Sequence, residues 1–168
     1  SHITLKDLDY KFEPDVYPVG RLDSDSEGLL LLTNDTSLNQ KLLSPKYKSP
    51  KTYHIQVEGI PSDDALKQIA RGVTIRIKGK SIDTQPCTIG RVHTVPEFPD
   101  RNPPIRFRKT VPTTWLVITL TEGKNRQVRR MLASINHPVL RLIRTQFASY
   151  IFGQEPLRML KSGEIIKL

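Results

Sequence analysis

The sequence predicts an α+β fold, in which a largely antiparallel sheet carries a few helices on one side. Three observations favour this class. Short apolar segments with strand-like alternation outnumber the helical ones, and the connections between them are short enough for hairpins. The length of 168 residues also suits one domain with a sizeable core. We therefore interpret residues 1–168 as a single domain.

The elements of the first half follow from local patterns. The apolar run 29–32 after a polar turn predicts a strand, and leucines at helical spacing over 38–43 predict a short helix. Residues 51–58 alternate between apolar and polar side chains, which predicts a half-buried strand. Ser62, followed by two acidic residues, predicts the start of a helix, and Gly72 predicts its end.

The second half predicts three further strands or hairpins and one helix. Residues 73–91 predict a hairpin around 78–80, and the apolar segment 115–120 predicts a strand. Apolar residues at i, i+3, i+4 and i+7 over 128–135 predict a helix with one buried stripe. The segment 139–143 predicts another strand.

The charge distribution favours a polyanionic partner. The net charge is +9, and basic proteins gain affinity for nucleic acids by releasing counterions from phosphates. The first 35 residues hold eight acidic side chains, whereas residues 123–154 hold six Lys or Arg and no acid. Arg126, Arg129 and Arg130 form a basic face at the start of the predicted helix, where the helix dipole also attracts phosphate. This block indicates nucleic acid, although basic faces also bind acidic proteins.

Residues 96–112 form a second basic segment. Five prolines exclude an ordinary helix or a central strand there. The segment also carries two aromatic rings and four cations, which are Phe98, Phe107, Arg101, Arg106, Arg108 and Lys109. It is either a solvated linker or a loop that grips folded RNA by phosphate contacts and stacking. The charge of the whole chain favours the RNA-contacting loop.

Several classes of protein lack support in the sequence. Cys87 is the only cysteine, so an internal disulfide is excluded and a cytoplasmic location is expected. The longest apolar run has four residues, too few to span a bilayer. The histidines lack metal-ligand spacing, and no phosphate-binding, dinucleotide or nucleophile-elbow motif is present. We therefore expect neither a metal nor a cofactor, which leaves carboxylate chemistry on a polyanion.

An acidic turn supplies the candidate carboxylates. Asp23, Asp25 and Glu27 lie between two apolar segments and are followed by Gly28. Ionisable residues in such a place sit at a strand end, where a rigid sheet can hold a side chain over a cleft. A solvated turn is the competing interpretation. A calcium loop is excluded, because the glutamate expected at its twelfth position falls on Asn34.

Residues 20–29 read G-R-L-D-x-x-S-E-G-L, which resembles the active-site motif of RNA pseudouridine synthases in the branch that modifies ribosomal RNA. Two further segments of that family follow in the same order, at 51–53 and 122–131. The segments 101–106 and 112–116 resemble an insertion of the subgroup that acts on large-subunit RNA. The resemblance implies a mixed sheet with a central catalytic cleft. It also implies isomerisation of uridine to pseudouridine in 23S ribosomal RNA, without a cofactor.

The resemblance implies roles for individual residues. Asp23 would be the catalytic carboxylate, either adding at the sugar carbon or abstracting a neighbouring proton. Tyr53, on the apolar face of its strand, would stack on the uracil, and Arg129 would pair with Asp23. Arg21 would lie beside the site and contact RNA. The other residues expected to bind RNA are Arg106, Arg108, Lys109, Lys124, Arg126 and Arg130.

Two other functions stay open from the residues themselves. A noncatalytic RNA-binding module would explain the charge, but an acid beside a basic surface lowers affinity for RNA. A nucleoside or glycoside hydrolase would use Asp23 with Asp25 or Glu27 as paired carboxylates and release free uracil. We favour the isomerase because three separated motifs agree.

The N-terminus departs from the family's pattern. The usual first strand with Asn-Lys-Pro is not found, and the chain begins Ser1-His2 rather than with methionine. We therefore expect that native residues have been trimmed upstream. We also expect the domain to act as a monomer.

Overall fold

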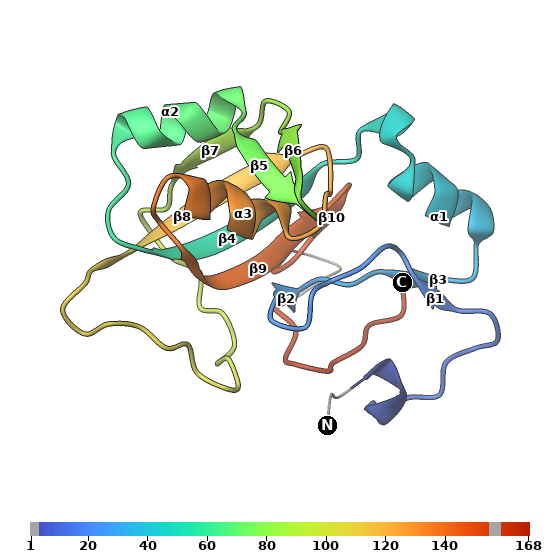
Figure 1. Cartoon of the computed structure of the whole chain (residues 1–168). Coiled ribbons are helices and arrows are strands. Elements are labelled where there is room, and N and C mark those ends of the chain that lie inside the picture. Colours follow the sequence, from blue (N-terminus) through green and yellow to red (C-terminus); the bar gives the residue numbers. More distant parts are fainter. Residues whose placement is uncertain (1–3, 155–158) are drawn as a thin grey trace.

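The computed structural model describes residues 4–154 and 159–168. Its centre is a sheet in which five strands follow the order β10-β9-β4-β8-β7, with β2 added beside β9 (Figure 1). All neighbouring strands on this path are antiparallel, whereas β2 runs parallel to β9. The mixed, largely antiparallel sheet is therefore confirmed. Its strands are β2 Glu27–Gly28, β4 Lys51–Glu58, β7 Thr88–Arg91, β8 Thr113–Leu120, β9 Val139–Phe147 and β10 Tyr150–Ile151.

Two helices cover one face of this sheet and close the main core. They are α2 (Asp63–Arg71) and α3 (Gln127–Ser134) (Figure 1). As expected, the Ser62 hydroxyl caps α2 by accepting a hydrogen bond from the Ala65 amide, and the helix ends at Gly72. The core joins strand and helix side chains that are fully buried, among them Ile55, Leu116, Ile118, Met131 and Leu132. Each such side chain contributes about 2 kcal/mol to folding.

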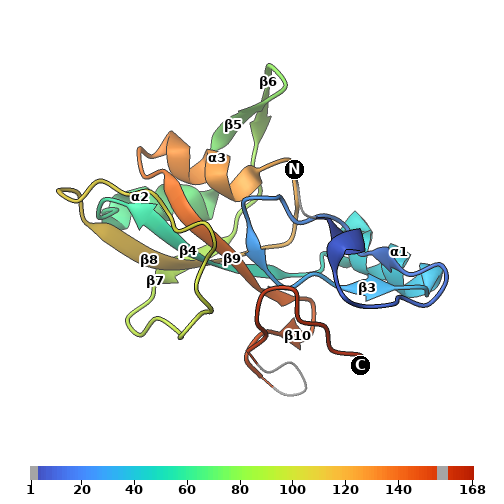
Figure 2. The same cartoon turned by 90° about the horizontal axis from the view of Figure 1, so that it is seen from below.

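Smaller elements surround the main sheet. Strands β5 (Thr74–Ile77) and β6 (Lys80–Asp83) form the predicted hairpin, which projects from the body beside α3 (Figure 2). On the other side, β1 (Tyr17–Pro18) pairs with β3 (Leu32–Thr33). The remaining elements are η1 Leu5–Asp7, α1 Thr36–Leu43 and η2 Pro45–Tyr47. Within the described ranges, no helix has the length and apolar character needed to cross a membrane.

The leucine run 29–32 differs from its prediction as one strand. β2 ends at Gly28 before the run, and β3 begins only at Leu32. The Leu29 amide donates to the Arg144 carbonyl of the main sheet, whereas the Leu31 carbonyl accepts from Val19 in the small sheet. The chain therefore crosses from one sheet to the other within these residues, and no single ladder can form.

Candidate active site

One buried guanidinium holds the acidic turn against the sheet. Arg144, in the middle of β9, is only 2% exposed. Its Nε donates to the Leu29 carbonyl at 2.9 Å, and its Nη1 donates to the Arg21 carbonyl at 3.3 Å. These carbonyls stand on either side of the turn that contains Asp23. Arg144 thus clamps both ends of the loop 21–29, which we call the catalytic loop.

A glycine allows the close approach of this loop to β9. Gly28 has φ of +105°, and a Cβ placed on it would lie 2.6 Å from the Arg144 backbone nitrogen and closer still to the carbonyl oxygen. Any side chain would therefore separate β2 from β9. Inside the loop, the Ser26 amide donates to the Asp23 carbonyl at 2.9 Å and closes a tight turn.

The start of α3 contacts the catalytic loop through a two-pronged ion pair. The Arg126 guanidinium donates to both carboxylate oxygens of Asp25, at 3.0 and 2.8 Å, and its Nη1 lies 3.7 Å from the Asp23 carboxylate. The bond from Arg126 holds the pKa of Asp25 below its ordinary value, and the same bond raises the pKa of Arg126. Arg126 is itself the N-cap residue of α3, with φ of +49°.

Arg129 differs from the expected direct pairing with Asp23. Its Nη2 donates to the Asp25 carbonyl at 2.8 Å, and its Nε lies 3.6 Å from the Asp25 carboxylate. The guanidinium within ion-pair distance of Asp23 is that of Arg126. Burial lowers the pKa of Arg129. In the described part of the chain, its buried Nε has no hydrogen-bond partner.

Tyr53 stands one strand away from the catalytic loop. In the sheet register Gly28 lies opposite Arg144, and Arg144 lies opposite Tyr53 on β4. The Tyr53 side chain is half-buried and packs against the main core. The structure thus brings the Asp23 loop, the Tyr53 strand and the first turn of α3 to one region around β9.

The residues expected to bind RNA have different surroundings. Arg106 and Lys109 are exposed on the segment 96–112, and Arg21 is exposed at the start of the catalytic loop. The others are already engaged: Arg108 with Glu58, Lys124 with Glu122, Arg126 with Asp25, and Arg130 with Asn125 and the Arg76 carbonyl. Exposed cations are thus concentrated on the long segment rather than on α3.

Sequence reasoning assigned no role to Arg144. Its position inside an apolar strand could have indicated a structural role. A charged side chain is rarely buried unless it has a partner. The sequence suggests Asp25 only as a calcium ligand, which is excluded, or as a second carboxylate for a hydrolase. The structure instead commits it to Arg126, a residue 101 positions away.

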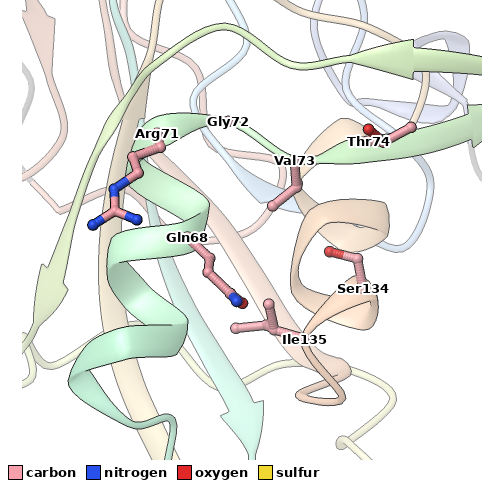
Figure 3. Close-up of a pocket in the computed structure, with 7 residues that line it drawn as sticks. All are labelled: Gln68, Arg71, Gly72, Val73, Thr74, Ser134 and Ile135. Carbon is pink, nitrogen blue, oxygen red and sulfur yellow. The ribbon is translucent and has the colours of Figure 1, made fainter.

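No other feature of the described residues competes as a reaction centre. Among them no group of three His, Cys, Asp or Glu side chains could hold a metal ion. A pocket of about 450 Å³ lies between the ends of α2 and α3 (Figure 3). It is lined by Gln68, Arg71, Gly72, Val73, Thr74, Ser134 and Ile135, and shares no residue with the Asp23 region. Its shallow, mainly neutral lining suggests no chemistry.

Comparisons with known proteins show which sequences this chain resembles. Residues 4–134, which include Asp23, Tyr53 and Arg129, match the family described as RNA pseudouridylate synthase. Ribosomal large subunit pseudouridine synthase E of Vibrio vulnificus is 50% identical over 89% of this chain and 60% of the relative. The protein of the same name from Xanthomonas campestris is 46% identical over 84% of this chain and 74% of the relative.

A crystal structure of a pseudouridylate synthase has the same fold. It aligns with a TM-score of 0.72 and 25% identity, covering 95% of this chain and 59% of the other. This likeness confirms the predicted fold class. The chain spans 60% and 59% of the length of the two Vibrio relatives.

Proposed function

Because this chain belongs to the RNA pseudouridylate synthase family, we propose that it isomerises uridine to pseudouridine in large-subunit ribosomal RNA. The observation that carries the proposal is the convergence of three distant segments around β9: the loop of Asp23, the strand of Tyr53 and the start of α3. The names of the relatives from Vibrio and Xanthomonas support large-subunit RNA as the substrate.

The reaction requires only correctly positioned acid–base groups from the protein. The bond between ribose C1′ and uracil N1 breaks, the base turns, and a bond forms between C1′ and C5. The C5 proton leaves and N1 gains one, so nothing is oxidised or reduced. Asp23 acts on the sugar, either by adding at C1′ or by abstracting a neighbouring proton. Both routes need an ionised carboxylate, and Arg126 provides a positive charge 3.7 Å away.

Tyr53 and Arg129 complete the proposed site. Tyr53 stacks on the uracil and accepts the C5 proton, in keeping with its half-buried place beside β9. The Arg129 Nε lacks a hydrogen-bond partner among the described residues. We assign this donor to the Asp23 carboxylate in the complex with RNA, where it would orient the acid.

The uridine must leave its stack to reach Asp23. The exposed cations Arg21, Arg106 and Lys109 would hold the surrounding phosphates, and the segment 96–112 would form the main RNA contact. Lys124, Arg126 and Arg130 would add positive potential near the start of α3. One catalytic domain that acts as a monomer in the cytoplasm belongs to the same proposal.

The hydrolase is disfavoured by the partners of its second carboxylate. Asp25 accepts two bonds from Arg126, and Glu27 accepts two bonds from Arg141. Each acid is therefore held in a two-pronged ion pair with an arginine, which disfavours a role in activating a water molecule.

Incubation with ribosomal RNA transcripts tests the proposal. Wild-type protein should modify an unmodified large-subunit transcript at one uridine, detected by carbodiimide labelling and primer extension, and should leave a small-subunit transcript unchanged. No free uracil should appear in the supernatant. Release of uracil would support a hydrolase, and tight binding without modification of naked or particle-bound RNA would support a noncatalytic module.

A further inference from the structure

The base of the long segment is docked on the sheet face opposite α2 and α3. We call residues 96–101 the basal arm. The Phe98 ring stacks on Trp115 of β8, with centroids 5.8 Å apart and planes at 30°. It also meets His54 of β4 edge-on at 5.4 Å. Such contacts add stability beyond buried area, so the arm has a defined seat although the tip beyond it is exposed.

Arg141 joins this arm to the catalytic loop. From β9, its Nε and Nη2 donate to the two carboxylate oxygens of Glu27, at 2.9 and 2.8 Å. The same Nη2 donates to the Pro99 carbonyl at 2.6 Å, and the guanidinium carbon lies 6.0 Å from the Phe98 ring centre. Arg101 adds a second cation 3.6 Å from Glu27.

The geometry of the Arg141–Glu27 pair suits it to link the position of the basal arm to that of the catalytic loop. The Arg141 and Glu27 side chains are only 15% and 25% exposed, so the pair is screened less than a surface ion pair. Glu27 is four residues after Asp23 and lies in β2, whose backbone is fixed against β9. A planar guanidinium can meet a carboxylate and a carbonyl at once, whereas a lysine cannot reproduce the fork.

We propose that Arg141 and Glu27 are positioning residues that couple RNA capture by the segment 96–112 to the placement of Asp23. The inference rests on the proposed isomerase function. RNA bound at the exposed tip fixes the position of the arm, which is hydrogen-bonded to Arg141. Arg141 fixes Glu27 and thereby the end of the catalytic loop. The arm thus supports the catalytic loop through Arg141 and Glu27, and the tip, residues 102–112, captures RNA.

The single tryptophan of the chain reports the docking directly. Because Phe98 covers Trp115, release of the arm should make the Trp115 fluorescence easier to quench with acrylamide. Arg141→Lys should raise the quenching constant about twofold, lower kcat about tenfold, and change the Kd for the transcript less than threefold. Glu27→Gln, which keeps the shape of the side chain and loses its charge, should have the same effects. It replaces Arg141→Lys as the test if that variant folds poorly.

Arg91→Lys is the matched control. Arg91 also bonds one carboxylate and one proline carbonyl, those of Asp63 and Pro61, at 2.5 and 2.7 Å. It lies at the end of β7, outside the proposed site, so this variant should leave quenching and kcat unchanged. Arg106→Gln, at the tip, should weaken RNA binding and leave the Trp115 quenching constant unchanged.

If the wild-type protein is active, two results would overturn the inference. Unchanged Trp115 quenching in both Arg141→Lys and Glu27→Gln would mean that the arm does not depend on Arg141. Increased quenching with unaltered kcat would mean that the arm is docked but not coupled to Asp23. A wild-type protein without isomerase activity would refute the proposed function and with it the coupling, whereas the quenching result would still decide whether Arg141 docks the arm.

Discussion

Gly28→Ala separates ordinary backbone strain from displacement of the catalytic loop. Gly28 has φ of +105° and Gly79, at the tip of the β5–β6 hairpin, has φ of +79°. Alanine is strained at both positions, by about 1 kcal/mol. Nothing lies within 4 Å of a Cβ on Gly79, so strain is the whole effect there. Gly79→Ala is therefore the matched control.

At Gly28 the added methyl group also collides with the Arg144 backbone. β2 must then leave β9, which breaks the bond from the Leu29 amide to the Arg144 carbonyl and the bond from Arg144 Nε to the Leu29 carbonyl, both 2.9 Å. A neutral hydrogen bond contributes about 1 kcal/mol and one to a charged group about 2 kcal/mol. We expect Gly28→Ala to lower the free energy of unfolding by about 4 kcal/mol in total, against about 1 kcal/mol for Gly79→Ala.

Urea unfolding measures the first effect and turnover on the transcript measures the second. A shift of the Asp23 loop by about 1 Å should reduce turnover about 100-fold, while Gly79→Ala should keep the wild-type rate. Unfolding free energies for the two variants within about 1 kcal/mol of each other would refute the inferred collision. Wild-type turnover in Gly28→Ala would refute the view that β2 positions the loop.

The remaining predictions concern single side chains of the site. In a double-mutant cycle, Asp25→Asn and Arg126→Gln should couple by about 0.5 to 1 kcal/mol in urea unfolding, because their side chains are 39% and 38% exposed; additive effects would show that the ion pair contributes nothing. The folded-state pKa of Asp25 lies below its ordinary value of 3.8, so its contribution to stability is present above that pH and lost as the pH falls through the lowered folded pKa. Unfolding midpoints between about pH 5 and pH 2 should therefore fall less steeply in Asp25→Asn than in the wild type, and parallel curves would contradict the shift. Tyr53→Phe keeps the ring and should lower kcat about 100-fold with unchanged RNA affinity, the loss typical of a missing proton acceptor; unaltered kcat would leave Tyr53 as a stacking surface only.

Local patterns predicted the parts of this fold that depend on local physics. Helix α2 follows from the Ser62 cap and the Gly72 stop, and helix α3 from the apolar spacing that includes Val128 and Met131. The leucine run 29–32 does not form the single strand that its pattern predicts, because its hydrogen-bond partners lie in two different sheets. Only tertiary structure decides which carbonyl a strand residue meets.

The candidate site also has parts that the sequence predicted and parts that only the tertiary structure shows. The motif resemblance located Asp23, Tyr53 and Arg129, and their assigned roles stay predictions. The pairing of Arg126 with Asp25 joins residues 101 positions apart, and no local pattern predicts which of three neighbouring arginines donates to both carboxylate oxygens of Asp25. The clamp by Arg144 depends on a parallel pairing of only two residues, Glu27 and Gly28, which is too short to leave a periodic signal.

Release of tritium from RNA that carries 5-tritiated uridine tests the central claim most directly, because isomerisation must remove the hydrogen at C5. Wild-type protein should release tritium in proportion to pseudouridine formed. Asp23→Asn, which keeps the size and the hydrogen-bonding shape of the side chain, should release none while binding the transcript with near wild-type affinity. Tritium release by Asp23→Asn at the wild-type rate would contradict the assignment of Asp23 as the catalytic carboxylate.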